Sequence, residues 1–96
     1  MIKVALVDDH QLIRTGLRSL LDSDPGLHVI AEASNGAEAL EVLAAERADV
    51  VLMDLSMPVM DGVEATARLR ESQPGVRVVV LTSFSDRARV QEAIGA

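Results

Sequence analysis

Residues 2–9 read IKVALVDD, an apolar run that is interrupted only by Lys3 and ends in two aspartates. Two later segments share its character: residues 50–53 are apolar and are followed by Asp54, and residues 76–81 are apolar except for Arg77. Short apolar runs of this kind, rich in β-branched residues, are typical of strands that are buried on both faces of a parallel sheet. These three segments therefore predict the centre of such a sheet.

Helical patterns lie between the predicted strands. A fourth, weaker strand is predicted over residues 28–33, between an Asp-Pro-Gly turn and an Asn-Gly pair. Further helices are predicted over residues 62–72, with Ala65 and Leu69 inward, and over residues 86–94. The apolar faces of the first two helices are expected to comprise Ile13, Leu17, Leu20 and Leu21, and then Leu40, Leu43 and Ala44, with Arg14, Arg18, Glu41 and Glu46 in water.

The predicted order is strand then helix, repeated four times. Because parallel strands need right-handed crossovers, this order predicts a doubly wound α/β domain with a parallel sheet covered on both faces. We expect residues 1–96 to form one domain. No linker, low-complexity tract or second domain is visible in the sequence.

Composition excludes several classes of function. The 96 residues carry 9 basic and 15 acidic side chains, a net charge of −6, and no basic cluster that would bind a nucleic-acid backbone. The absence of cysteine excludes disulfides, thiolate metal sites and a cysteine nucleophile. No apolar run approaches the roughly 18 residues that a membrane span needs, so we expect no membrane segment.

Acidic residues follow two of the predicted strands. Ligands of open parallel sheets bind outside the carboxyl ends of the strands, so Asp8, Asp9 and Asp54 would meet at one edge if their strands are neighbours. Three clustered carboxylates repel one another, and a divalent cation would neutralise them; an open site with few oxygen ligands favours Mg²⁺. Taken singly, Asp8 or Asp9 could instead cap the following helix, and Asp54 could be an ordinary loop residue.

The loop after the third strand completes a recognisable pattern. Residues 53–62 read MDLSMPVMDG, in which Pro58 and Gly62 favour a tight turn. Together with VDDH at residues 7–10 and LTS at residues 81–83, this order and spacing resembles a response-regulator receiver domain. Residues 8–17, DDHQLIRTGL, are similar to receivers of the NarL/LuxR type. The resemblance implies a flavodoxin-like sheet with the strand order 2-1-3-4-5.

The resemblance also implies roles for particular residues. Asp54 would be the phosphoacceptor, taking a phosphoryl group from a sensor histidine kinase, and Thr82 the hydroxyl that follows that group in the switch. Asp9 would bind Mg²⁺ directly, Asp8 partly through water, and Ser56 through its backbone carbonyl. The chain would then be a cytoplasmic signalling module of a two-component system and not an enzyme. It would control transcription through a DNA-binding output domain that lies outside this sequence.

One part of the family pattern is missing. Receivers of this type carry a lysine on a fifth strand, followed by a fifth helix, and we expect both to lie beyond Ala96. Lys3 is the only lysine, and it begins the first strand, at the opposite edge of the sheet from Asp54. Without a fifth strand, residues 76–81 would form an unprotected sheet edge, so we expect homodimerisation or other self-association.

Two other functions compete with this interpretation. A magnesium-dependent phosphatase with an aspartate nucleophile usually has a second aspartate two residues later, where this sequence has Ser56. The chain could also be a structural fragment that only self-associates. His10 is interpreted as a loop residue near the site, and Met53, Met57 and Met60 as packing residues.

Overall fold

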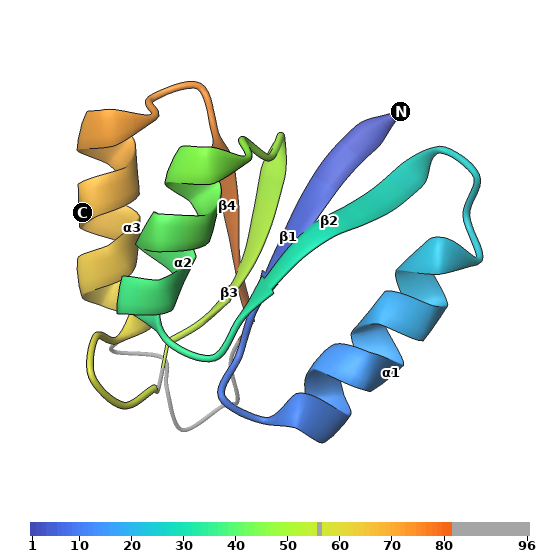
Figure 1. Cartoon of the computed structure of the whole chain (residues 1–96), viewed down its shortest axis with the longest axis horizontal. Coiled ribbons are helices and arrows are strands. Elements are labelled where there is room, and N and C mark those ends of the chain that lie inside the picture. The colour runs from blue at the N-terminus through green and yellow to red at the C-terminus, as the bar shows by residue number, and fades with distance from the viewer. Residues whose placement is uncertain (56, 82–96) are drawn as a thin grey trace.

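A computed structural model of the chain describes residues 1–55 and 57–81 and has the predicted α/β architecture. Four parallel strands form one sheet in the order β2-β1-β3-β4, as a doubly wound fold requires (Figure 1). The predicted helix over residues 86–94 lies outside the described residues. The elements in chain order are β1 (Ile2–Val7), α1 (Gln11–Asp22), β2 (Leu27–Ala33), α2 (Gly36–Ala45), β3 (Val50–Asp54), α3 (Gly62–Ser72) and β4 (Arg77–Leu81).

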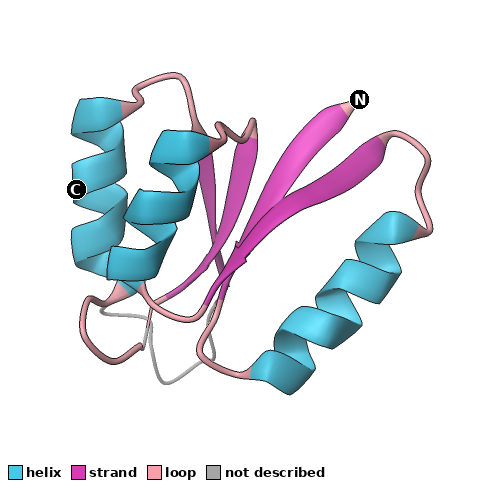
Figure 2. Ribbon diagram, viewed as in Figure 1, coloured by secondary structure: helices cyan, strands magenta, loops and turns pink. Residues whose placement is uncertain are grey.

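The helices cover the two faces of the sheet unequally. Figure 2 shows α2 and α3 side by side on one face, and α1 is the one described helix on the other. The larger core lies under α2 and α3, where Leu43, Met53 and Leu69 are fully buried. The smaller core lies under α1 and contains Val4, Leu6 and Val29. Within residues 1–55 and 57–81, no helix is both long and apolar enough to span a bilayer.

The first helix buries less of its apolar face than the sequence predicted. Leu17 and Leu21 pack against the smaller core, but Ile13 and Leu20 are 48% and 68% exposed. Among the described elements α1 packs mainly on β2 and β1, and the side chains outside that contact lie in water. Arg14 was predicted to be solvated and is instead half-buried, because it forms an ion pair with Glu32 of β2.

Two further predictions of burial were wrong. Ala44 is exposed, whereas Ala39, five residues earlier in α2, is buried. The fourth strand is not buried on both faces, since Val79 is 47% exposed. Among the described strands it pairs only with β3.

Side-chain hydrogen bonds to the first turn show which residues cap the helices. The Asn35 side chain accepts the backbone N–H of Glu38 at the start of α2, and Asp61 accepts that of Glu64 at the start of α3. The residue that precedes α1 is His10, whose side chain makes no capping bond. Capping of α1 by Asp8 or Asp9, the alternative left open by the sequence, is therefore wrong.

The turn between β3 and α3 depends on a close backbone approach at Gly62. The Gly62 N–H donates to the carbonyl of Leu55 at 3.0 Å. A β-carbon on residue 62 would lie 2.2 Å from the carbonyl oxygen of Asp54 and 2.9 Å from the α-carbon of Leu55. Backbone atoms cannot yield as a flexible side chain can, so only glycine fits here.

We predict that Gly62→Ala destabilises the domain by about 1–3 kcal/mol, because the methyl group must displace the end of β3. Gly16→Ala is the matched control: Gly16 lies in α1 with nothing within 4 Å of the added β-carbon. It should stabilise the fold by about 0.5–1 kcal/mol through helix propensity. Urea unfolding measures both changes, and equal stabilities of the two variants would refute the proposed close approach.

Candidate metal and phosphoacceptor site

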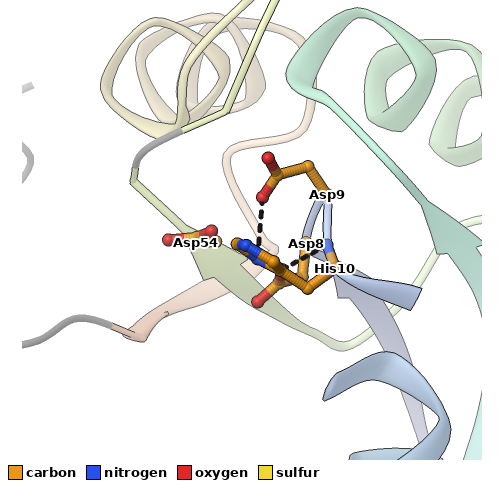
Figure 3. A group of neighbouring side chains, drawn as sticks. All are labelled: Asp8, Asp9, His10 and Asp54. Atoms are coloured by element: carbon orange, nitrogen blue, oxygen red, sulfur yellow. Dashed lines mark hydrogen bonds and ion pairs between the residues drawn. The ribbon is translucent and has the colours of Figure 1, made fainter. Parts of the chain in front are cut away.

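The candidate site lies where two neighbouring strands end. Strands β1 and β3 pair in parallel, with Val7 opposite Met53, so the residues that follow Val7 and Met53 emerge at the same edge. Asp8 and Asp9 directly follow β1, and Asp54 is the last residue of β3. Figure 3 shows their side chains converging on one another, as the sequence predicted.

Four side chains form the acidic cluster, namely Asp8, Asp9, His10 and Asp54. One ligand atom from each lies within 4.8 Å of all the others. Asp8 is only 5% exposed, whereas Asp54 is half-buried and Asp9 open to solvent. Three converging carboxylates, one of them nearly buried, suit a hard divalent cation that keeps several waters, so the donor set fits Mg²⁺.

Asp8 is the most firmly held member of the cluster. Its backbone N–H donates to the carbonyl of Ala33 in β2 at 3.0 Å, and its own carbonyl accepts from Nη1 of Arg14. Its carboxylate accepts the backbone N–H of His10 at 2.8 Å. Each polar group of Asp8 therefore has a partner, which fixes where the carboxylate points.

His10 is a member of the cluster that the sequence placed only nearby. Its Nδ1 lies 2.9 Å from Oδ1 of Asp8 and 3.1 Å from Oδ1 of Asp9 (Figure 3). The hydrogen bond with Asp8, followed by the negative charge of Asp9, raises the pKa of His10 above 6.5. The imidazolium form would supply positive charge between two carboxylates.

The loop after β3 is fastened to its surroundings at several points. Val59 has a positive φ of 68°, and the N–H of Met60 donates to the carbonyl of Pro58 at 2.8 Å, which makes a tight turn. The carbonyl of Met60 accepts the N–H of Gly36, at the start of α2, also at 2.8 Å. Met57 and Met60 pack against the larger core, so the predicted packing role of these methionines is confirmed.

Two predicted site residues cannot be placed. Ser56 and Thr82 lie outside the described residues. Lys3 is described, and it lies at the start of β1, where its backbone N–H donates to the carboxylate of Asp49. It therefore lies where the strands begin, at the opposite end of the strands from Asp54, as predicted.

Comparison with known proteins agrees with this geometry. A family model described as the response regulator receiver domain matches residues 4–96. The chain is 47% identical over 94 residues to the transcriptional regulatory protein LnrK of Bacillus subtilis (strain 168), covering 98% of this chain and 43% of LnrK. It is 43% identical over 96 residues to the transcriptional regulatory protein LiaR of the same organism, covering 100% of this chain and 46% of LiaR.

A solved structure is also similar. The signal receiver domain of the putative response regulator NarL from Mycobacterium tuberculosis matches with a TM-score of 0.90 and 35% identity, covering 98% of this chain and 76% of that one. The resemblance to NarL/LuxR-type receivers is confirmed. The chain spans less than half the length of the two Bacillus regulators.

We predict that Asp8→Asn lowers the pKa of His10, because it removes the hydrogen bond that contributes most to the raised value. The ring-proton shifts of His10 followed against pH by NMR measure this directly. Asp9→Asn should lower the pKa less. An unchanged His10 pKa in both variants would contradict the contacts described above.

The raised pKa of His10 predicts how the stability of the fold changes with pH. A histidine whose pKa is raised by folding stabilises the fold most below its unfolded pKa, and the contribution disappears as the pH rises through the folded value. The stability difference between the wild type and His10→Gln should therefore be greatest below pH 6.5 and vanish at alkaline pH. Urea unfolding across this range would measure it, and a difference that grows with pH would contradict the assignment.

Proposed function

This chain belongs to the response regulator receiver domain family, and from that premise we propose that it is the phosphoacceptor module of a two-component regulator, with Asp54 as the phosphoacceptor. One observation carries the proposal: Asp54 joins Asp8 and Asp9 within 4.8 Å. Asp54 is half-buried, so solvent and a donor can reach its carboxylate from the edge of the sheet.

The proposed reaction is the transfer of a phosphoryl group to Asp54. One carboxylate oxygen of Asp54 attacks phosphorus, and a new O–P bond forms as the P–N bond of the kinase phosphohistidine breaks. The imidazole leaves with the electron pair of that bond and takes up a proton. Because little covalent work is required of the protein in phosphoryl transfer, its main tasks are to position the nucleophile and to balance charge.

The acidic cluster would hold the metal ion for this step. Asp9 and Asp54 would bind Mg²⁺ through carboxylate oxygens, Asp8 partly through water, and Ser56 through its backbone carbonyl. When bound, Mg²⁺ would neutralise charge on the phosphoryl oxygens. The contacts of Asp8 with Ala33, Arg14 and His10 support this arrangement, because they hold the carboxylate without occupying all its lone pairs.

The switch that reads the phosphoryl group would need further residues. We assign the hydroxyl of Thr82 to this role. A positive charge beside it would complete the switch, and Lys3 is on the wrong edge of the sheet to supply one.

The proposed partners follow from this role. A sensor histidine kinase would donate the phosphoryl group in the cytoplasm, and the module would act as a signalling domain and not as an enzyme with its own turnover. The two Bacillus relatives are named transcriptional regulatory proteins and are more than twice as long as the matched segment. We therefore propose that DNA is contacted through an output domain outside residues 1–96.

Self-association would use the fourth strand. In the described part of the chain, β4 stands last in the sheet order, and Val79 is 47% exposed. Edge strands without lysine, proline or inward charge are templates for pairing with another chain. Residues 78–81 have none of these protections, so we propose that a second copy pairs here.

We predict that incubation with acetyl phosphate and Mg²⁺ adds one phosphoryl group, at Asp54 alone. Intact-mass spectrometry, with peptide mapping after borohydride trapping of the acyl phosphate, would detect it. Asp54→Asn should abolish the adduct, and Asp9→Ala should slow its formation by more than about tenfold through loss of the metal. An adduct of equal yield in Asp54→Asn would disprove the assignment.

We predict that Val79→Lys shifts the chain towards monomer, because a charge inside the edge strand opposes strand pairing. Leu12→Lys is the matched control, since Leu12 is 84% exposed but lies on α1, away from β4. Sedimentation velocity at equal concentration compares them. If the two variants associate to the same extent, β4 is not the contact.

A further inference from the structure

Arg14 links the acidic cluster to the neighbouring strand. It lies in the first turn of α1, and its side chain, 15% exposed, turns back towards the end of β1. Nη1 donates to the carbonyl of Asp8, and Nε donates to Oε1 of Glu32 at 3.2 Å. One guanidinium thus joins β2 to the residue that begins the cluster.

The position of Glu32 makes this link a rigid one. Glu32 pairs with Leu6 in the β1–β2 register, and the next residue, Ala33, accepts the backbone N–H of Asp8. Both peptide groups of Asp8 are therefore tied to β2: one directly, through the Asp8 N–H, and the other through Arg14 and Glu32, at the Asp8 carbonyl. The planar fork of arginine suits this double contact, which a lysine ammonium cannot reproduce.

We propose that Arg14 is a positioning residue for the metal site, acting through the backbone of Asp8 on the carboxylates of Asp8 and Asp9. The inference rests on the proposed function, because it concerns how well the cluster holds Mg²⁺. Fixing the Asp8 carbonyl fixes the peptide that joins the two aspartates. Without Arg14 that peptide could rotate. The carboxylate of Asp9, which lies 3.1 Å from Nδ1 of His10, would then no longer be held beside that of Asp54.

Charge and geometry make opposite predictions for this residue. Removing a cation near three carboxylates would by itself strengthen Mg²⁺ binding, but only slightly, because Glu32 already neutralises Arg14. Loss of positioning would weaken binding instead. Residues that orient metal ligands typically change metal affinity by about 10–100-fold when mutated. Weaker binding by a variant that has lost positive charge would therefore identify positioning as the cause.

Arg18 provides the matched control. Its Nη1 contacts Oε2 of the same Glu32 at 2.5 Å, and its Nε lies 3.8 Å from Asp22, but no contact joins it to the cluster among the described residues. Arg18→Gln removes the same charge and an ion pair with the same partner. It should leave Mg²⁺ affinity within about twofold of the wild type.

The experiment is a Mg²⁺ titration of the chain, followed through the backbone amides of Asp9 and Asp54 by NMR. Measured well below the melting temperature, the dissociation constant is insensitive to a loss of global stability. Arg14→Gln should weaken binding at least about tenfold relative to Arg18→Gln. If Arg14→Gln does not fold, Arg14→Lys and Arg18→Lys give the same comparison at constant charge.

The outcomes separate the two proposals. Equal Mg²⁺ affinity of the Arg14 and Arg18 variants, with normal binding by the wild type, would overturn the role of Arg14 and leave the proposed function standing. A wild type that binds no Mg²⁺ would overturn both. Weaker binding confined to the Arg14 variants would support the positioning role.

Discussion

The structure depends on the parallel pairing of β1 with β3, which forces like charges together. Because Val7 lies opposite Met53, the strands deliver Asp8 and Asp54 to the same point of the sheet edge. Carboxylates this close repel one another, and the nearly complete burial of Asp8 adds to the cost. Contacts around the cluster offset part of this cost: Nδ1 of His10 lies against the carboxylates of Asp8 and Asp9, and Arg14 and the Ala33 carbonyl hold the main chain. A bound Mg²⁺ would supply further positive charge.

The fold could be predicted from sequence because its signals are local. Three of the described strands are apolar runs with a single charged interruption at most, and glycine or asparagine stands at the start of α2 and α3, so these elements and their order followed directly. The convergence of Asp8, Asp9 and Asp54 followed from the rule that parallel strands present their carboxyl ends at one edge. To locate the candidate site at the carboxyl ends of the strands, it was enough to know which residue type follows each strand.

The predictions that failed depended on contacts distant in sequence. Arg14 was predicted to lie in water because its helical face is polar. Its side chain is instead half-buried, because Nε donates a hydrogen bond to Glu32, 18 residues later. Ile13 and Leu20 were placed inside because the helical period cannot tell how much of a face the sheet will cover. His10 was read as a neighbour of the site, because no local pattern shows that its ring reaches back to two carboxylates.

If the three carboxylates form one site, a phosphoryl group and a divalent cation meet there. A crystal structure of the chain grown with Mg²⁺ and beryllofluoride, which mimics a phosphoryl group on a carboxylate, would show both. We expect beryllofluoride on Asp54 and a cation about 2.0–2.1 Å from carboxylate oxygens of Asp9 and Asp54. Beryllofluoride on another carboxylate, or a cation bound away from this cluster, would contradict it.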